Sequence, residues 1–311
     1  MIMSCCEPRV QMEKSPYHYP VMYREVLEHL NLNNVRVVVD CTLGLGSLAS
    51  KLLEKMPADS ILIGLDRDER SLNIASQRLS SFGSRVIYFK SDFLNLDDVL
   101  GDLKIQKVDA FIFDLGISTY QLSDAQRGFS FLQEGPLDMR MDSDSFFSAY
   151  DLVNNLSERE LEQIFRKFGE EHYSRRIAAS IVQSRRIEPI STTTKLVEII
   201  LNSVPGKYAK YRIHPATRAF QALRIAVNRE LDVLEKAIDK AVSFLNPQGR
   251  IGVISFHSLE DRIVKHAFKR ISSIGGLNIV TKKPLQPEDL EISENKPSRS
   301  AKLRIAEKVC C

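Results

Sequence analysis

The chain has 311 residues, and its 43 Lys and Arg nearly balance 40 Asp and Glu, so the formal net charge is +3. With 43% apolar residues, 14 Gly and 12 Pro, the composition is that of an ordinary globular protein with one large domain or two smaller ones. It excludes a histone-like tail, an acidic disordered chain and collagen. The apolar runs are far shorter than the roughly 20 residues that span a bilayer, so we expect no membrane partner. The N-terminal residues also lack the pattern of a secretion signal.

The five cysteines indicate a reducing compartment. Cys5, Cys6, Cys310 and Cys311 lie near the two ends of the chain, and Cys41 is the fifth. They show neither the spacing of metal ligands nor a disulfide framework. We therefore expect a cytoplasmic protein without a metal site.

The small net charge hides strong differences along the chain. Residues 92–162 contain 5 basic and 15 acidic residues, whereas residues 166–224 contain 12 basic and 4 acidic, and residues 262–308 contain 11 basic and 5 acidic. Basic segments can follow a phosphate backbone, because Lys and Arg that neutralise phosphates release counterions. They can equally be solvated helix faces. Charge alone leaves both interpretations open.

The first 115 residues alternate apolar, β-rich runs with helical patterns. Helical spacing of Leu48, Leu52 and Met56 separates the first two strands, and that of Leu72 and Leu79 follows the second. The predicted strands are residues 35–40, 61–66, 86–89 and 110–114. This βαβαβ order predicts a parallel sheet with right-handed crossovers.

The pattern changes after Asp114. Residues 115–145 form a loop-like stretch rich in Gly, Ser and Asp. Ser157 and Glu160 then form a capping box for a helix that we expect to stop at Gly169. Further predicted elements are helices at about 173–186, 194–203 and 217–245, an Asn-Pro-Gln-Gly turn at 246–249, and a fifth strand at 250–256.

These elements predict an α/β protein whose sheet domain is interrupted. We expect an N-terminal tail over residues 1–16 and a discontinuous sheet domain over residues 17–122 and 217–311. We expect residues 123–216 to form an all-helical insertion, which is the candidate domain for recognising RNA or another substrate.

A glycine loop follows the first predicted strand. The strand ends at Asp40, and the chain then reads Cys-Thr-Leu-Gly44-Leu-Gly46-Ser47 before the next helix. Glycines let the backbone approach a ligand closely, and a helix N-terminus offers free N–H groups. The string alone is weak, because the dinucleotide-binding fingerprint permits it and a tight turn can require it.

Acids at the ends of the strands sharpen this interpretation. Asp66 ends the second strand, where a carboxylate can accept both ribose hydroxyls, and Asp92-Phe93 follows the third, where an acid and an aromatic ring can contact adenine. Asp114 ends the fourth strand, beside the expected reaction centre. Each acid alone is compatible with a cap or turn. Together with Asp40 and the acidic stretch 92–162 they favour S-adenosylmethionine, whose sulfonium and amino groups are positive, over NAD, whose pyrophosphate would be repelled.

Several long strings indicate a family. They are RGFSF at 127–131, GPLDMRMD at 135–142, GEEHYSRRIA at 169–178, HPATRAFQALRIAVNRELDVLE at 214–235, ISFHSLEDRIVK at 254–265 and SRSAKLRIAE at 298–307. From about Tyr17 to Lys308 the chain closely resembles the bacterial MraW/RsmH family, the 16S ribosomal RNA cytosine-N4 methyltransferases that act on cytidine 1402 in the decoding region. The resemblance implies a class I S-adenosyl-L-methionine-dependent methyltransferase fold with a helical insertion. It also implies 16S rRNA of the small ribosomal subunit as partner; a homodimer is compatible with the sequence.

The resemblance also implies cofactor contacts. Carried over by motif, they are Gly46, Ser47, Leu48, Asp66, Phe93, Asp114 and Gln121. The family usually has Gly-Gly-His where this chain has Gly46-Ser47-Leu48. The change is tolerable if backbone groups make the contacts, and it lowers cofactor affinity if the imidazole contributes. A smaller departure is Ser118-Thr119, where the family often has two serines.

Methyl transfer to a cytosine amine needs alignment and a hydrogen-bond acceptor. The reaction is an in-line displacement, so the enzyme must hold the amine in line with the methyl group. The amine lone pair is delocalised into the ring, and an acceptor on the amine hydrogens localises it and takes the lost proton. Asp114 is the candidate catalytic acceptor. The Pro-Pro-aromatic sequence that often follows such an acid is absent, so another segment must hold the base.

The remaining motifs supply candidates for binding the base and the RNA. Those for the base are Asp138, Arg140, Arg224, Asn228, His257, Ser258 and Glu260. For Arg224 and Asn228 the alternative is a helix surface or a cap to a neighbouring loop, and for His257 a structural role is favoured. Met139 and Met141 are expected to anchor their loop in the core. Candidates for RNA contact are Arg175, Arg176, Arg185, Arg186, Lys207, Lys210, Arg212, Arg299, Lys302 and Arg304, with Tyr208 and Tyr211 stacking on bases or packing.

Two other functions compete with an RNA methyltransferase. An NAD-dependent oxidoreductase would require a loop that tolerates pyrophosphate, and Asp40 and the missing third glycine argue against it. A non-catalytic RNA-binding or ribosome assembly factor of the same fold is supported only by the Ser47-Leu48 departure.

Overall fold

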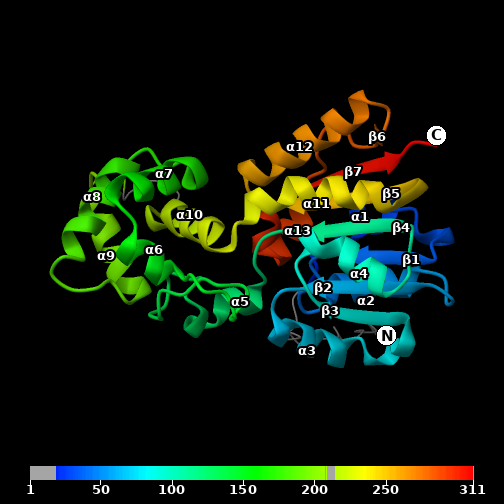
Figure 1. The fold of residues 1–311 in the computed structure, drawn as a ribbon, viewed down its shortest axis with the longest axis horizontal. Helices are drawn as coiled ribbons and strands as arrows, with labels where there is room; N and C mark the ends of the chain where they lie inside the picture. Colours follow the sequence, from blue (N-terminus) through cyan, green and yellow to red (C-terminus); the bar gives the residue numbers. More distant parts are fainter. Residues whose placement is uncertain (1–18, 207, 209–213, 311) are drawn as a thin grey trace, which may run out of the picture.

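The computed structural model describes residues 19–206, 208 and 214–310. A part built on a β-sheet and a part built from helices lie next to each other along the long axis of the molecule (Figure 1). The sheet has seven strands in the order β3-β2-β1-β4-β5-β7-β6. The strands are β1 (Val37–Asp40), β2 (Ile61–Asp66), β3 (Val86–Lys90), β4 (Val108–Asp114), β5 (Leu245–Ser255), β6 (Leu277–Ile279) and β7 (Lys302–Lys308).

The order in which successive strands are added to the sheet changes direction at β1. Strands β1 to β5 are parallel, and β7 pairs antiparallel with β5 and β6. Strand β1 pairs with β2 on one side and with β4 on the other, so Asp40 lies opposite both Gly64 and Ile112. In open α/β sheets, ligands bind outside the carboxyl ends of the strands at such a switch point. The sheet therefore directs attention to the ends of β1 and β4.

Apolar cores cover both faces of the sheet. The apolar sides of α4, α11 and α12 pack on one face, and those of α1, α2 and α3 pack on the other. These helices are α1 (Tyr23–His29), α2 (Ser47–Lys55), α3 (Glu69–Arg78), α4 (Leu96–Asp102), α11 (Glu230–Phe244) and α12 (Ser258–Ser273). The resulting three layers confirm the predicted α/β fold with a mostly parallel sheet.

Short helical elements connect these layers. The short α-helices are α5 (Thr119–Ser123) and α13 (Asp289–Glu294). The 3-10 turns are η1 (Leu32–Asn34), η2 (Ser80–Arg85), η3 (Phe93–Asn95), η4 (Ala125–Arg127) and η6 (Lys296–Ser300). None of the helices in the described part of the chain is long and apolar enough to cross a membrane.

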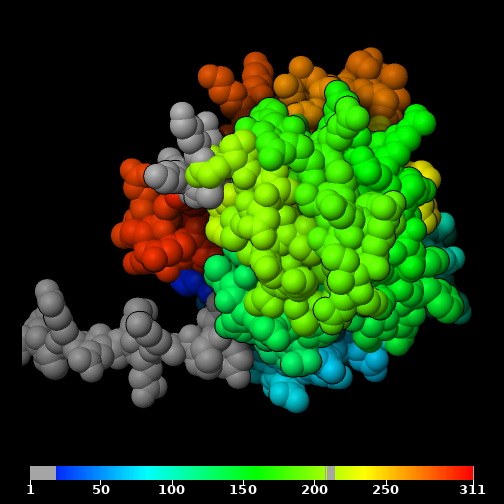
Figure 2. Space-filling view, turned by 90° about the vertical axis from the view of Figure 1, so that its left-hand side faces the viewer, coloured from blue at the N-terminus to red at the C-terminus, as the bar shows by residue number. Residues whose placement is uncertain are grey.

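The helical part has its own apolar core. It contains α6 (Ala149–Asn155), α7 (Glu158–Gly169), α8 (Ser174–Ser184), α9 (Thr193–Ser203) and α10 (Ala216–Asn228), with Phe165 and Ile177 fully buried between them. The predicted capping box of Ser157 and Glu160 begins α7, as expected. Seen from this end, the helices form one rounded face bordered by α12 and by the C-terminal segment (Figure 2).

The predicted helix over residues 217–245 is wrong in one respect, because it is two helices. Arg229, with φ 52°, separates α10 from α11. Leu223, before the break, packs in the core of the helical part, whereas Leu234, after it, packs in the core of the sheet part. Helix α10 thus packs with the helical insertion, although the sequence pattern placed residues from 217 onward in the sheet domain.

One further boundary differs from the prediction. Strand β5 begins at Leu245, directly after α11, and it includes the predicted Asn-Pro-Gln-Gly turn as an irregularity in its pairing with β4. Helix α7, in contrast, ends at Gly169 as predicted, and the next residue, Glu170, is left-handed, with φ 47°.

Candidate active site

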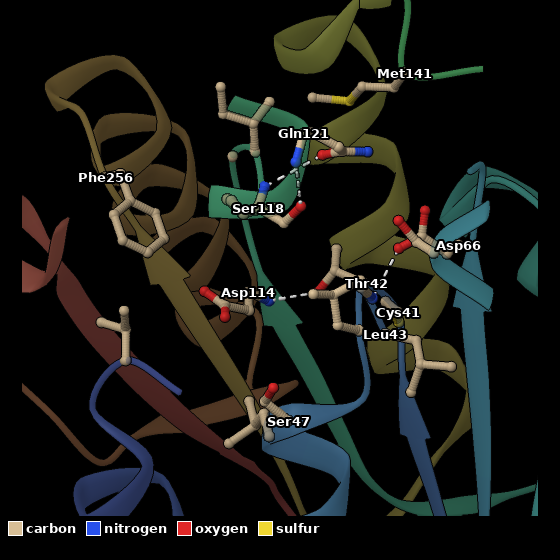
Figure 3. A pocket seen from close by; sticks show the side chains of 18 of the residues that line it. Cys41, Thr42, Leu43, Ser47, Asp66, Asp114, Ser118, Gln121, Met141 and Phe256 are labelled. Carbon is tan, nitrogen blue, oxygen red and sulfur yellow. Dashed lines mark hydrogen bonds between the residues drawn. The ribbon is translucent and has the colours of Figure 1, made fainter. Parts of the chain in front are cut away.

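A pocket lies at the carboxyl edge of the sheet, at the switch point between β1 and β4 (Figure 3). Its wall is formed by the loop after β1, from Cys41 to Leu48, and by the segment after β4, from Asp114 to Gln121. Asp66 ends β2 on one side, and Phe256 and Glu260 follow β5 on the other. Parallel strands therefore bring side chains that are distant in the sequence to one cavity.

The loop between β1 and α2 must contain a glycine at one position. Gly46 has φ +75°, and a Cβ atom there would lie 3.0 Å from Leu79 Cδ1. A residue with a side chain would be strained in this conformation and would press on the core. Helix α2 begins directly afterwards, at Ser47, which lines the pocket. The first turn of a helix thus starts at the edge of the cavity, where its N–H groups have no partner within the helix.

Asp66 holds the loops after β1 and β2 together. One carboxylate oxygen, Oδ2, accepts from the N–H of Gly44 at 2.8 Å, and Oδ1 accepts from the N–H of Asp68 at 2.8 Å. Burial raises the pKa of Asp66 to about 6, although these two hydrogen bonds oppose the shift. The carboxylate retains lone pairs that can accept from ribose hydroxyls.

Asp114 is the most perturbed acid in the pocket. Its backbone N–H donates to Thr42 Oγ1 at 2.6 Å, which fixes the end of β4 against the loop after β1. Its Oδ1 atom is buried and has no hydrogen-bond partner among the described residues. Burial, followed by the charges of Asp40 and Glu260, raises the pKa of Asp114 to about 8. A buried polar atom without a partner is costly, so this oxygen is a candidate to bind a ligand.

Phe93 lines the pocket as predicted, but Asp92 does not. The Asp92 carboxylate accepts from the N–H of Leu94 at 2.7 Å and forms an ion pair with Arg67. The Arg67 guanidinium also lies over the Phe93 ring, 5.5 Å from its centroid. Asp92 thus orients the aromatic side chain instead of reaching the cavity.

Most of the residues predicted to contact the cofactor come together here. All of them except Gly46 line the pocket. The Ser47 hydroxyl accepts a hydrogen bond from Arg78. The side-chain amide of Gln121 donates to Asp68 Oδ2 at 2.9 Å, and its oxygen accepts from the N–H of Ser118 at 3.2 Å. Gln121 therefore braces α5 against the loop after β2.

Arg127 ties the pocket to the helical part. Its guanidinium donates to Asp68 Oδ2 at 2.8 Å and to the carbonyl oxygens of Arg140 and Met141 at 3.0 and 2.8 Å. Asn228, at the end of α10, donates to the Met139 carbonyl and accepts from the Met141 N–H, both at 2.8 Å. Two side chains thus hold the loop whose Met141 side chain lines the pocket.

Those contacts decide between the alternatives for Asn228 and the two methionines. Asn228 caps a neighbouring loop, as one of the two interpretations proposed. Met139 is fully buried, as expected of an anchor. Met141 is only partly buried and faces the cavity, so it is an anchor and a wall residue together.

A second polar group occupies the wall between α11 and α12. Arg224 donates to both carboxylate oxygens of Glu230, at 3.0 and 2.9 Å. Ligand-type atoms of Glu230, His257 and Glu260 all lie within 4.8 Å of one another, and Glu230 and Glu260 line the pocket. The Arg224 guanidinium supplies a positive charge to this group, so its acids already have a counterion. Glu230 was not among the predicted residues, because at a helix start it resembles an ordinary first-turn acid.

His257 has a structural role, as favoured above. Its Nδ1 accepts from the N–H of Glu260 at 3.3 Å, and its Nε2 lies 3.1 Å from Glu260 Oε1. The other Glu260 oxygen, Oε2, accepts from the N–H groups of Phe256 and His257 at 2.8 and 3.2 Å. His257 and Glu260 thus form the capping box that begins α12. The His257 hydrogen bond is the largest of the influences that lower the pKa of Glu260, and they outweigh its burial.

Of the seven candidates for binding the base, Glu260 alone lines the pocket; Arg224, Asn228 and His257 act as described above, and Asp138, Arg140 and Ser258 lie elsewhere. Asp138 and Arg140 pair with each other at 2.7 Å, and Arg140 also donates to the carbonyl oxygens of Ser143 and Ser145. Ser258 donates to Glu170 Oε2 at 3.0 Å. None of the three candidates lines the pocket. They brace loops at the border of the two parts.

The candidates for RNA contact fall into two groups, side chains that hold the fold and side chains that are exposed. Arg185 donates to the carbonyl oxygens of Val153 and Leu156, both at 2.6 Å. Arg304 is buried and paired with Asp261 at 2.6 Å, and Lys302 contacts the same acid at 3.3 Å. These side chains hold the fold. The exposed members in the described chain are Arg175, Arg176, Arg186 and Arg299, while Lys207, Lys210, Tyr211 and Arg212 lie outside the described residues.

The acidic stretch 92–162 contributes less to the pocket than the sequence suggested. Asp114 is the one acid of this stretch that lines it; the others come from Asp66, Glu230 and Glu260. Many acids of the stretch are used locally, as Asp124 and Asp151 are in capping the starts of η4 and α6. Net charge in a window therefore did not locate the acidic cavity.

A positively charged ligand fits this cavity. Asp40, Asp66 and Asp114 all have pKa values raised by burial, to about 7, 6 and 8. Asp114 also presents its buried Oδ1 oxygen. A cation placed among these acids would satisfy that oxygen and favour the carboxylate forms, whereas a pyrophosphate would meet repulsion. The sheet order with an antiparallel β7, and this pocket at the switch point, define a class I S-adenosyl-L-methionine-dependent methyltransferase.

Comparison with known proteins gives the family within this class. The profile of the MraW methylase family matches residues 15–309, so the chain belongs to that family. It is 45% identical over 307 residues to the ribosomal RNA small subunit methyltransferase H of Clostridium botulinum (strain Loch Maree / Type A3), covering 94% of this chain and 99% of the relative. It is 43% identical over 308 residues to the protein of the same name from Clostridioides difficile (strain 630), with 94% and 99% covered. An rRNA methylase structure from Streptococcus thermophilus aligns with a TM-score of 0.42 and 14% identity, covering 93% of this chain and 94% of that one.

Proposed function

We propose that this protein transfers a methyl group from S-adenosyl-L-methionine to the exocyclic N4 of a cytidine in 16S ribosomal RNA, at position 1402, in the small ribosomal subunit. The curated relatives named ribosomal RNA small subunit methyltransferase H support an rRNA substrate, because the likeness extends over 94% of this chain. The motifs that resemble the MraW/RsmH family support the position and the atom. With such a substrate, we propose that the protein acts in the cytoplasm.

Asp114 is the observation on which the chemistry depends most. It ends β4 at the switch point, it lines the cavity, and its buried Oδ1 has no partner in the described part of the chain. An amine whose lone pair is delocalised needs an acceptor beside it, and a carboxylate with a raised pKa is a better base than an exposed one. Burial raises the pKa of Asp114 to about 8 in the cofactor-free protein, and a positive ligand beside it would favour the carboxylate that accepts from the amine.

The pocket residues have separate roles in this reaction. S-adenosyl-L-methionine, when bound, would supply a methyl group from its positive sulfur, which would leave as a neutral thioether as the S–C bond breaks. Asp66 is placed to hold the ribose hydroxyls, and Phe93 to cover the adenine ring. Asp114 accepts a hydrogen bond from the target amine, which localises the nitrogen lone pair, and takes the proton released when the N–C bond forms. Leu115 and Ile117 line the pocket with these acids and help to exclude water.

We further propose that the helical part recognises the RNA. Arg175, Arg176 and Arg186 are exposed on α8 and the residues that follow it. Exposed guanidinium groups can neutralise phosphates without taking part in the fold. Arg127 and Asn228 hold the loop whose Met141 side chain lines the pocket, so they join this part to the reaction centre.

Methyl incorporation into RNA tests this function. Purified protein and labelled S-adenosyl-L-methionine would be incubated with small subunits, naked 16S RNA and DNA of the same sequence, followed by nuclease digestion and mass spectrometry. We expect N4-methylcytidine at one position of the ribosomal RNA and none in DNA. Cofactor binding with no methylated product on any RNA would favour the non-catalytic assembly factor, and no binding at millimolar cofactor would exclude the enzyme.

A further inference from the structure

Glu230 lies at the break between α10 and α11. It is the first residue of α11, directly after the left-handed Arg229 that separates this helix from α10. The break turns the chain from the helical part into the sheet part, and it brings the Glu230 side chain into the pocket wall with Asp114 and Phe256. A continuous helix would place residues 224 and 230 on different faces, because six residues correspond to about 600° of rotation at 100° each.

The position of the Glu230 carboxylate is fixed by Arg224. The guanidinium Nε and NH2 groups donate to Oε1 and Oε2 at 3.0 and 2.9 Å, which is the two-point geometry that holds a carboxylate plane. The side chains of Arg224 and Glu230 are 15% and 11% exposed, so water competes little for this pair. Arg224 itself does not line the pocket. The arginine therefore stands behind the carboxylate and leaves its other lone pairs to the cavity.

Glu230 differs from the second acid in the same wall. Glu260 is committed to the start of α12, because its oxygens bind the backbone N–H groups of Phe256 and His257 and contact the His257 ring. Within the described part of the chain, the side-chain hydrogen bonds of Glu230 are those to Arg224. Of the two acids on this side of the pocket, Glu230 has the greater capacity to accept from a ligand.

The chemistry of the target base completes the assignment. The exocyclic amine of cytosine offers two hydrogens, whereas uracil has a carbonyl oxygen at the same place. A carboxylate accepts from the cytosine amine and repels the uracil oxygen, and enzymes that act on a displaced base read this edge by hydrogen bonds. Asp114 serves one amine hydrogen under the proposed function, which leaves the other to a second acceptor.

We propose that Glu230 is this second acceptor and that it selects cytosine over uracil, with Arg224 as its positioning residue. The inference rests on the proposed function, since it takes a cytosine amine as the substrate. It assigns base specificity to the break between α10 and α11. The joint, meaning the contact region between the sheet part and the helical part, would then also help to recognise the base.

The test compares two RNAs and matched variants. Fragments of 16S RNA would carry cytidine or uridine at the methylated position, and their dissociation constants would be measured with S-adenosylhomocysteine present. We expect the wild-type protein to bind the cytidine RNA about tenfold more tightly. In Glu230→Gln the amide can turn its NH2 group toward the uracil oxygen, so we expect the ratio to fall to about one and kcat to fall by about 10²-fold.

Two further variants separate selection from folding. Glu235→Gln changes an acid on the same helix whose side chain is 55% exposed and paired with Arg270, and we expect it to keep the wild-type ratio. Arg224→Lys keeps the charge but loses the two-point geometry, so its ratio should fall at least about threefold while cofactor affinity is retained. If Glu230→Gln does not fold, this second variant decides the question.

The outcomes distinguish the inference from the proposed function. A wild-type protein that makes no N4-methylcytidine contradicts the proposed function. An active wild-type protein whose Glu230→Gln and Arg224→Lys variants bind cofactor and keep the full preference for cytidine contradicts the role of Glu230 alone. Loss of the preference in both, with Glu235→Gln unchanged, supports it.

Discussion

The sheet part buries the charges that we assign to chemistry, whereas the helical part displays those that we assign to recognition. Asp66 and Asp114 lie inside the pocket with pKa values raised by burial. Arg175, Arg176 and Arg186 lie on the surface of the helical part. Burial favours the uncharged form of a carboxyl group until a cation binds beside it. An exposed arginine stays charged and can bind a phosphate. The two parts thus prepare for ligands of opposite charge.

The interior and the surface of the joint are held by different kinds of contact. Inside it, Arg127 and Asn228 bind the loop that contains Met139 and Met141. Outside it, Glu170 of the helical part accepts from Ser258 and Arg262 of α12 at 3.0 and 3.1 Å. Buried hydrogen bonds stabilise such a joint more than exposed ion pairs do. The comparison predicts large effects for changes in the pocket and joint interior, and small ones for changes at its surface.

Replacing Asp114 should have the largest effect. In Asp114→Ala the amine loses its acceptor, so we expect kcat to fall by about 10³-fold or more. RNA binding should change little, because the exposed arginines do not line the pocket that contains Asp114. Single-turnover methylation and RNA titration measure the two quantities. Activity close to wild type would show that the buried charge of the sheet part is not catalytic.

A methyl group on Gly128 should damage the joint. Gly128 has φ +66°, and a Cβ atom there would lie 2.1 Å from the Pro136 carbonyl oxygen. Because this carbonyl is backbone, Gly128→Ala must displace the loop and should cost at least about 2 kcal/mol of the free energy of unfolding. Denaturant unfolding measures the loss, with Gly101→Ala as control, since a Cβ at Gly101 meets nothing within 4 Å. Equal stability of the two variants would contradict the role of this loop in holding the joint.

Cofactor binding should depend on pH in a defined direction. The raised pKa values of Asp40, Asp66 and Asp114 mean that the folded, cofactor-free protein holds protons that the unfolded chain releases near pH 4. Their contribution to stability is therefore lost as the pH rises toward about 8. A positive ligand favours the ionised acids, so affinity for S-adenosyl-L-methionine should rise by up to about tenfold per pH unit below 8 for each proton released.

Calorimetry at several pH values, in buffers with different heats of ionisation, measures both the affinity and the protons released. Asp114→Asn removes the acid with the highest of these pKa values and should flatten the profile between pH 7 and 8. An affinity that falls as the pH rises would contradict the sign of the linkage.

The surface pair between the parts should matter least. The side chains of Arg262 and Glu170 are 56% and 48% exposed, so Arg262→Ala should cost no more than about 0.5 kcal/mol of stability. Thermal unfolding with and without 1 M salt measures it. A loss several times larger would show that the surface of the joint, rather than its interior, holds the two parts together.

The sequence revealed the sheet well because its strands are regular and its motifs lie at their ends. Strand β2 has the predicted bounds, and Asp66, Phe93 and Asp114 line one pocket. The break at Arg229 was not visible, since apolar residues continue at helical spacing from Leu223 to Leu234 although they enter different cores. Apolar periodicity indicates that one face of a helix is buried, but it does not indicate which core that face packs against.

The site was predicted less completely for a similar reason. Asp138 and Arg140 were expected to help form the base pocket, yet they are paired with each other and lie outside the pocket wall. Glu230 became visible only in the structure, where the break at Arg229 places it beside Arg224 and the cavity. Contacts between distant residues depend on tertiary packing, which a single sequence does not display.

Our main proposal is that the buried acids of the sheet part and the exposed arginines of the helical part cooperate to methylate one cytidine of 16S ribosomal RNA. The most direct measurement is the identity and position of the methylated nucleoside after incubation of the purified protein with small subunits and S-adenosyl-L-methionine. We expect N4-methylcytidine at position 1402 for the wild-type protein and none for Asp114→Ala. Methylation of another atom or another nucleoside, or an unmodified RNA with bound cofactor, would contradict the proposal.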